Sequence, residues 1–236
     1  TACAGVCPVQ CISMTADSEG FKYPIADPNI CISCGKCEQV CPMGASKQDS
    51  LRIAYAVRVQ RYEQESSSGG VFSVLAERTI SDGGVVFGAA YDENLKLRHL
   101  KVNDMSMLGY LRGSKYVQSS IGNACEQVKE ALEDGVKVLF SGTPCQVAGL
   151  NAYLGKKKEG LVTVDIACHG VPRPGLWEKY RRAVERRHGA SLKSVDFRDR
   201  SEGWRHYNIR YDFQEKSVTV PRAKDPYLAL FLQDMT

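Results

Sequence analysis

The sequence has no long hydrophobic run. Its longest apolar stretches, such as VVFGAAY from Val85, are far shorter than the roughly 20 residues that a helix needs to cross a bilayer. Strong charge of one sign is also missing, because 31 Lys and Arg against 27 Asp and Glu leave a net charge of +4, too mild to indicate a nucleic-acid partner. Neither a GxGxxG fingerprint nor a Walker loop occurs, so no common nucleotide motif identifies a ligand. We therefore expect no membrane span and no nucleic acid.

Cysteine is sparse over most of the chain and dense at its start. The chain has 236 residues, of which 43% are hydrophobic and 25% charged, as in a globular protein with an ample core. Seven of the ten cysteines fall within the first 41 residues, at positions 3, 7, 11, 31, 34, 37 and 41. A disulfide framework is typical of small secreted domains, whereas this clustering and its C-x2-C-x2-C spacing favour metal in a reducing compartment. We expect a cytoplasmic protein.

CISCGKCEQVCP, residues 31–42, is a complete C-x2-C-x2-C-x3-C-P run, the pattern of bacterial ferredoxins. In that pattern three thiolates from one loop bind three corners of a 4Fe-4S cluster, and the fourth cysteine ligates the neighbouring cluster. The spacing therefore predicts one cluster held by Cys31, Cys34 and Cys37 together with Cys7.

TACAGVCP, at the start of the chain, has the form of the second half of such a run. Cys41 would then join Cys3 and two cysteines upstream of Thr1, which predicts that the chain is a fragment beginning inside its first motif. Zinc is the alternative, but zinc sites usually pair two C-x2-C units without the terminal Cys-Pro. Cys11 is extra; we interpret it as a small buried hydrophobe, with a spare ligand as the alternative.

From about residue 51 the pattern changes to apolar strands that alternate with amphipathic helices. Strands are predicted at 53–59, 84–91, 97–102, 136–142, 161–167, 194–197 and 206–213. Helices are predicted at 71–80, 122–135, 144–154 and 174–187, with a last one in DPYLALFLQDMT at the C-terminus. Such alternation predicts a mixed α/β domain over residues 51–236, at least partly parallel, after an α+β ferredoxin-like head over residues 1–48.

Two strand–loop–helix junctions have features of anion sites. SGTPC, residues 141–145, follows a strand and opens a helix, with Thr143 suited to the N-cap and Pro144 to the first helical position. Amides at a helix start favour anions such as phosphate. SSSGGVF, residues 66–72, likewise precedes a helix. Each loop alone is explained by capping and turn chemistry; both together in one sheet favour a phosphate-bearing cofactor.

Three cysteines lie in the body. Cys145 stands at a helix start, which favours the thiolate and suits a nucleophile or a metal ligand. Cys168 ends a strand beside His169, either as a catalytic Cys–His pair or as a packed cysteine. Cys125 lies within a helix and is expected in the core.

Basic residues gather in the C-terminal half. Residues 177–224 carry 13 Lys and Arg against 7 Asp and Glu, concentrated in KYRRAVERRH. A solvated helix face explains this excess; the alternative is a docking surface for an acidic ferredoxin or a polyanionic cofactor.

These motifs together resemble the coenzyme F420 hydrogenase/dehydrogenase beta-subunit family. The resemblance lies in CISCGKCEQVCP, SSSGGVFSVL, GGVVFGAAYD, RGSKYVQS, VLFSGTPCQVAGL, VDIACHGVP and LWEKY, in this order. It implies FAD in the α/β body and 4Fe-4S clusters that pass single electrons. By the resemblance, the flavin site would be lined by Ser68, Gly69, Gly70, Gly113, Ser114, Lys115, Gly142 and Thr143. It also implies that Cys145 and Cys168 ligate a further cluster near the flavin, completed by a C-x2-C beyond this chain.

The resemblance implies an activity as well. A flavin accepts two electrons as hydride and releases them singly, and a cluster passes one at a time. We therefore expect an iron–sulfur flavoprotein oxidoreductase that couples a hydride carrier such as coenzyme F420 to a redox partner protein, such as a ferredoxin or another oxidoreductase subunit. The alternatives are an electron-transfer subunit without flavin, and a Cys–His hydrolase.

Overall fold

The computed structural model describes residues 2–44, 53–155, 159–204 and 206–233. Its first part is a small unit built around an antiparallel hairpin in which Ile12 pairs with Ala26. The unit consists of α1 (Ala2–Val6), β1 (Ile12–Ala16), β2 (Lys22–Ala26), α2 (Lys36–Gln39) and the 3-10 turn η1 (Pro42–Gly44). We call it the head. The expected boundary at 48–51 lies outside the described residues.

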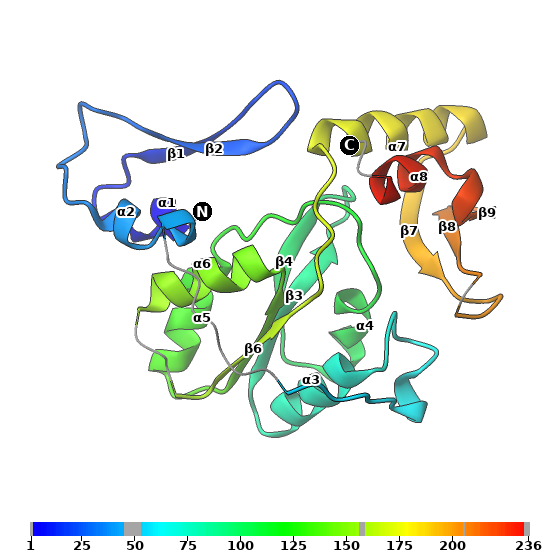
Figure 1. The fold of residues 1–236 in the computed structure, drawn as a ribbon, viewed down its shortest axis with the longest axis horizontal. Helices are drawn as coiled ribbons and strands as arrows, with labels where there is room; N and C mark the ends of the chain where they lie inside the picture. The colour runs from blue at the N-terminus through cyan, green and yellow to red at the C-terminus, as the bar shows by residue number, and fades with distance from the viewer. Residues whose placement is uncertain (1, 45–52, 156–158, 205, 234–236) are drawn as a thin grey trace.

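A four-stranded sheet forms the centre of the body (Figure 1). Its order is β4 (Leu97–Val102), β3 (Val85–Tyr91), β5 (Val138–Gly142) and β6 (Leu161–Asp165). The strands β3, β5 and β6 are parallel, and β4 runs antiparallel to β3. The predicted mixed, partly parallel α/β domain is confirmed.

Both faces of this sheet are covered, since neighbouring residues of a strand point to opposite faces. Phe87 and Phe140 pack toward α5 (Ala124–Glu133) and α6 (Pro144–Leu154). Val86 and Leu139 pack toward α3 (Val71–Ser81) and α4 (Leu108–Leu111). All four side chains are fully buried, which explains why β3 and β5 read as continuous apolar runs.

A second sheet and two helices follow. The antiparallel strands are β7 (Leu192–Asp199), β8 (Asn208–Phe213) and β9 (Ser217–Pro221), and the helices are α7 (Pro174–His188) and α8 (Pro226–Leu232). Trp177 of α7 and Tyr227 of α8 pack on Phe197 of β7, with ring centroids 5.2 and 5.9 Å away. Figure 1 shows both helices on one side of this sheet.

Most predicted elements are present, and the bounds of α6 and β4 agree with the prediction to the residue. The strand predicted at 53–59 is wrong: this segment is not a strand, and Ile53, Tyr55 and Val57 are exposed. Apolar alternation fits a strand, but a strand also needs a partner edge. This segment instead runs along the loop before α3, where Val59 N–H donates to Gly69 O over 2.9 Å. The two backbones approach so closely there that a Cβ at Gly69 would collide with Val57 O.

The head packs on the body at two places. Helix α1 lies against α5 and α6, where Gly5 faces the ring of Tyr153 with little room for a side chain. The turn of the hairpin meets the start of α7, where Gly175 N–H donates to Glu19 O (2.9 Å) and Arg173 pairs with the Glu19 carboxylate (2.7 Å). Among the helices of the described residues, none has the length and hydrophobicity to cross a membrane.

Candidate functional site

The cysteines of the complete run lie on an irregular loop that leads into α2. Ser33 and Gly35 have positive φ values of 54° and 70°, which turn the chain sharply between the first and third cysteines. Cys31 and Cys34 are exposed, and Cys37 lies half-buried in α2. Because α1 packs on α2, the head brings the two cysteine runs side by side.

Cys3 and Cys7 belong to α1 and its C-terminal end, and both are half-buried. Cys7 Sγ lies 3.4 Å from Cys11 Sγ. Cys11 is buried, and its pKa is raised to about 12 by its hydrogen bond with Cys7, then by burial and by Cys31. The interpretation of Cys11 as a buried side chain is confirmed, and its sulfur touches a predicted ligand.

The donor set of the head consists of thiols, and a 4Fe-4S cluster offers a separate iron to each thiolate. In the described parts of the chain, no three His, Cys, Asp or Glu side chains are placed to share one metal ion. The amides of Ser33, Cys34 and Gly35 have no backbone acceptor among the described residues, which leaves them available to cluster sulfides. The head cysteines therefore fit the predicted group.

The SGTPC junction is engaged in capping α6. Gln146 Oε1 accepts the N–H of Thr143 (3.0 Å), the reciprocal arrangement of a capping box. Gln146 Nε2 donates to Ser119 Oγ (2.8 Å), and Thr143 Oγ1 lies 3.1 Å from Cys145 Sγ. The N–H of Thr143, at the helix start where phosphate binding is expected, is therefore already hydrogen-bonded within the protein.

Cys145 and Cys168 follow neighbouring parallel strands, β5 and β6, at the same edge of the sheet. Gly142 O accepts the N–H of Ile166 at this edge (3.0 Å). Both thiols are exposed, so the alternative of a packed Cys168 is wrong. His169 packs edge-on against Phe231 with ring centroids 5.3 Å apart. Cys125 is buried and its pKa is raised to about 11 by burial, which confirms it as a core residue.

A pocket of about 810 Å³ opens between the loop before α3 and the second sheet. We call it the sheet pocket. Its lining consists of Glu63, Gln64, Glu65, Ser66, Ser67, Gly113, Asp196, Arg198, Asp199, Arg200, Ser201, Gly203, Trp204 and Arg210. A smaller adjoining pocket of about 370 Å³ is lined by Ser68 and Gly69 and shares Glu63, Arg200 and Trp204 with the first.

Two of the three loops expected at the flavin site thus converge here: Ser68 and Gly69 from one, Gly113 from the other. Gly70 is the N-cap of α3 next to them. Gly142 and Thr143 belong to neither lining.

The RGSK loop is held in place at both ends. Lys115 Nζ donates to Arg112 O (2.6 Å) and Gly113 O (3.3 Å). Burial lowers the pKa of Lys115 to about 8, against the raising influence of Asp196 in the pocket floor. Arg112 Nε donates to Ser73 Oγ (3.0 Å), and its guanidinium pairs with Glu65. The loop, α3 and the turn before it therefore form one connected wall, with Ser114 between Gly113 and Lys115.

Sequence reasoning missed the opposite wall, which comes from RDRSEGW. Arg200 and Arg198 both lie over the ring of Trp204, with guanidinium carbons 4.3 and 4.9 Å from its centroid, and Arg198 is also 4.9 Å from that of Tyr207. Arg200 Nη1 also donates to Glu63 O (3.1 Å) and to Ser66 O. The signal in the sequence is the pair of alternating arginines before a tryptophan; a count of charges alone shows them only as part of the basic C-terminal half.

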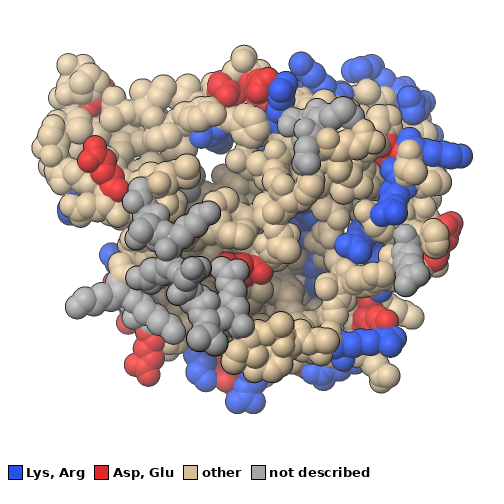
Figure 2. All heavy atoms as spheres, in the orientation of Figure 1, with Lys and Arg blue, Asp and Glu red and all other residues tan. Residues whose placement is uncertain are grey.

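The basic helix α7 is partly neutralised within itself. Arg181 pairs with Glu178 (2.7 Å) and Glu185 (2.8 Å), and Arg182 pairs with Glu178 (3.0 Å). Figure 2 shows Lys and Arg gathered over α7 and the second sheet. The pairs support the solvated-face interpretation for part of the helix.

Comparison with known families matches two segments of the chain. Residues 1–45 match the 4Fe-4S dicluster domain. Residues 135–229 match the family described as the C terminus of the coenzyme F420 hydrogenase/dehydrogenase beta subunit.

Individual relatives of the head are ferredoxins. The chain is 49% identical over 43 residues to the 7Fe ferredoxin of Hydrogenibacillus schlegelii, covering 18% of this chain and 49% of that one. It is 42% identical over 48 residues to ferredoxin-1 of Caulobacter vibrioides, covering 20% and 38%. It is 32% identical over 83 residues to a ferredoxin of Streptomyces griseus, covering 33% and 74%. The chain thus spans about half or less of the first two relatives.

Among solved structures, the chain is similar to one in the F420-reducing NiFe hydrogenase complex from Methanosarcina barkeri. The sequence identity is 17% and the TM-score 0.43, with 69% of this chain and 57% of that chain covered.

Proposed function

We propose that the chain is an iron–sulfur flavoprotein oxidoreductase of the coenzyme F420 hydrogenase/dehydrogenase beta-subunit type. The proposal is supported by the match of residues 135–229 to the C terminus of that beta subunit and of residues 1–45 to the 4Fe-4S dicluster domain. The observation that carries the proposal is the convergence of Ser68, Gly69 and Gly113 on two adjoining pockets in a body joined to a cysteine-rich head.

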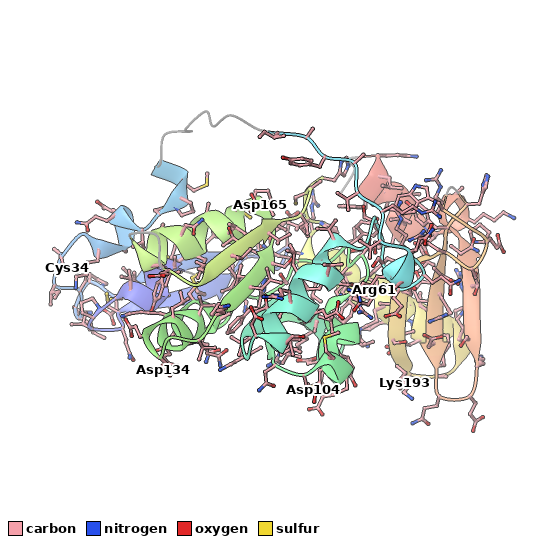
Figure 3. The ribbon with its side chains drawn as sticks, turned by 90° about the horizontal axis from the view of Figure 1, so that it is seen from below. Cys34, Arg61, Asp104, Asp134, Asp165 and Lys193 are labelled. Carbon is pink, nitrogen blue, oxygen red and sulfur yellow. The ribbon has the colours of Figure 1, made fainter. Side chains whose placement is uncertain are left out.

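In this proposal the head holds the clusters, which supply one-electron transfer. Cys31, Cys34 and Cys37 hold one cluster with Cys7, and Cys3 and Cys41 contribute to a second. The exposed Cys31–Cys34 loop lies at one end of the molecule, and Figure 3 shows Cys34 there, far from Lys193 on β7. A redox partner protein, such as a ferredoxin or another oxidoreductase subunit, would approach this end.

The inner side of the head is packed on the helix that leads to the body's cysteines. Both α1 and η1, which follows Cys41, lie against α6, and α6 begins beside Cys145. We propose Cys145 and Cys168 as further cluster ligands, because both thiols are exposed at the same sheet edge. The packing of α1 on α6 keeps the two sets of ligands in one molecule at a constant separation.

The flavin, FAD by the resemblance, supplies the exchange between hydride and single electrons. Ser68, Gly69 and Gly113 would contact it directly, with Gly70, Ser114 and Lys115 beside them. The hydrogen bonds of Lys115 to Arg112 O and Gly113 O hold this loop at the pocket. Support is weaker for Gly142 and Thr143, because they cap α6 and belong to neither lining.

The hydride carrier is a small molecule, and the family description names coenzyme F420. We propose it as the first carrier to test, with nicotinamide nucleotides as the comparison. The alternative function is an electron-transfer subunit whose body binds no flavin.

The test is anaerobic purification of the full chain, with iron, sulfide and acid-released flavin measured per chain. We expect flavin near one per chain together with several irons, and reduction of the flavin by the carrier. Iron without flavin, even after incubation with FAD, would leave only the electron-transfer alternative.

Cys34→Ser tests the head in the same preparation. We expect it to remove about one cluster's worth of iron and leave the flavin, because Cys34 is an exposed thiol of the complete run. The matched control is Cys125→Ser, a buried thiol in the core, which should leave the iron unchanged. Equal iron in the Cys34 variant and the wild type would contradict the assignment.

A further inference from the structure

The floor of the sheet pocket is one face of the second sheet. Asp196 and Arg198, two residues apart on β7, face the pocket while Phe197 between them is buried. A register irregularity follows Asp196, and the buried Asp199 also belongs to the lining. Arg210 of β8 pairs in register with Asp196 and lies in the same lining. The two arginines therefore come from adjacent strands of one rigid sheet.

Arg198 and Arg200 have guanidinium groups without an anionic partner. Within the described residues, neither forms an ion pair with a carboxylate, whereas Arg210 pairs with Asp212 at 3.2 Å. The Nε atoms of Arg198 and Arg200 are both buried with no hydrogen-bond acceptor in the described chain. A buried donor left unbonded costs free energy, more so when it is charged. Both Nε donors thus remain unbonded within the described part of the chain.

Each carboxylate of the same lining accepts a hydrogen bond within the protein, and that of Asp196 comes from the N–H of Arg198 (2.9 Å). Glu63 binds Arg58 through two nitrogens, at 3.1 and 2.7 Å. Glu65 pairs with Arg112, and Asp199 accepts from the amide and hydroxyl of Ser201 (3.1 and 3.2 Å). Asp196 and Asp199 form no ion pair among the described residues, so two arginines and two carboxylates of the pocket wall lack an ionic partner, and the unbonded buried donors are those of the arginines.

Trp204 stacks on the two guanidinium groups; Arg200 Nη1 is bonded to Glu63 O and Ser66 O, whereas the terminal nitrogens of Arg198 have no acceptor among the described residues. Each lies over the indole ring, at 4.3 and 4.9 Å from its centroid. The N–H bonds of a guanidinium lie in its plane, so stacking on a ring does not use them. A planar fork of this kind matches the oxygens of a phosphate. Ser66 and Ser67 add hydroxyls across the pocket.

We propose that Arg198 and Arg200, held by Trp204, bind the phosphate or diphosphate of a nucleotide in the sheet pocket. The inference rests on the proposed function for the identity of that nucleotide as a flavin nucleotide. A pocket of about 810 Å³ is within the usual range for ligands of that size.

The test compares ligands with and without phosphate on the full chain after its flavin has been removed. Dissociation constants are measured for FAD, FMN, riboflavin and ADP, for the wild type and for Arg198→Gln and Arg198→Lys. We expect Arg198→Gln to weaken FAD, FMN and ADP about tenfold or more, the loss typical of a charged hydrogen bond. Riboflavin binding should stay within about twofold of the wild type, since it has no phosphate.

Arg222→Gln is the matched control. Arg222 also stacks on an aromatic ring, 5.0 Å from the centroid of Tyr207, but it does not line the sheet pocket. It should bind all four ligands as the wild type does. Arg198→Lys keeps the positive charge but lacks the planar guanidinium. Its affinity for FAD, FMN and ADP should therefore lie between those of the wild type and Arg198→Gln. If Arg198→Gln lowers the melting temperature, the lysine variant is the one compared with the wild type.

The outcomes separate the two proposals. Binding of ADP that is lost in Arg198→Gln, with no binding of FAD, FMN or riboflavin, would uphold the phosphate site and overturn the flavoprotein. Equal FAD affinity in the wild type and both Arg198 variants would overturn the phosphate site and leave the flavoprotein standing. Failure of the wild type to bind any of the four ligands would overturn the phosphate site.

Discussion

At the scale of single residues, Asp225 shows how the C-terminal unit is held together. Its carboxylate is fully buried, and its Oδ2 accepts from the hydroxyls of Tyr180 and Tyr211, both over 2.6 Å. Its Oδ1 accepts the N–H of Leu228 (2.9 Å), which caps α8. One side chain therefore joins α7, β8 and α8.

Asp225→Ala should lower the free energy of unfolding by about 3 kcal/mol or more, because two buried hydroxyls and a helix cap lose their acceptor. Tyr180→Phe removes one donor only and should cost about 1 kcal/mol. Urea denaturation followed by circular dichroism measures both. Equal losses in the two variants would show that the shared carboxylate does not connect the three elements.

His99 predicts a pH dependence. Its ring is buried, stacks on Phe140 at 5.0 Å and places Nε2 3.1 Å from Ser141 O. Burial lowers the pKa of His99 below 6.5, against a smaller raising influence from the backbone bonds. Below about pH 6.5 the unfolded chain therefore binds more protons at this residue than the folded chain does, and the stability falls as pH falls.

Denaturant unfolding at pH 7.5 and pH 5.5 tests the prediction. We expect the wild type to lose more stability over this interval than His99→Gln, which cannot titrate. If the two lose the same amount, His99 does not carry the effect.

At the scale of elements, the residues at the start of α6 test whether this junction caps the helix or binds a cofactor. Gln146 is the acceptor for Thr143 N–H and also donates to Ser119 Oγ. Gln146→Ala should cost about 1 to 2 kcal/mol of stability, because it leaves a helix-start amide unbonded, and should leave the flavin content unchanged.

Gln146→Glu keeps the acceptor for Thr143 and loses the donor to Ser119, so it should cost less than the alanine variant. Thermal melting and flavin release measure the two properties in the same samples. Loss of flavin in Gln146→Ala with little change in melting temperature would instead place Gly142 and Thr143 at the cofactor.

At the scale of the whole molecule, the head and body meet through an apolar contact and a polar one. The Glu19–Arg173 pair is largely exposed, at 42% and 53% of the side chains, and such pairs contribute at most about 1 kcal/mol. Helix α1 on α5 and α6 has the closer fit, because a Cβ at Gly5 would lie 3.3 Å from the ring of Tyr153.

Gly5→Leu should therefore loosen the head much more than Glu19→Ala does, because a branched side chain cannot fit against this ring. Hydrogen exchange of the α5 and α6 amides measures the loosening, with iron content as the control for an intact head. Faster exchange in Glu19→Ala than in Gly5→Leu would show that the hairpin turn is the main attachment.

Several features were readable in the sequence because neighbouring residues decide them. The spacing of Cys31, Cys34 and Cys37 places three thiols on one loop, and the TPCQ start of α6 caps its own helix. Strands are predicted at 84–91 and 136–142, and β3 and β5 lie there with most of their residues buried. The strand predicted at 53–59 is wrong because apolar alternation alone does not supply a partner strand; this segment instead lies beside the loop at Gly69.

The sequence by itself thus determined the cysteine-rich head, most of the strands and helices of the body and the resemblance to known families, because all three depend on local spacing. Only the tertiary structure decided which loops share a pocket. Arg200 reaches Glu63 O and Ser66 O across more than 130 positions of the chain, a contact that no local pattern indicates. Such contacts are set by how the second sheet packs against the loop before α3, which is a property of the folded chain as a whole.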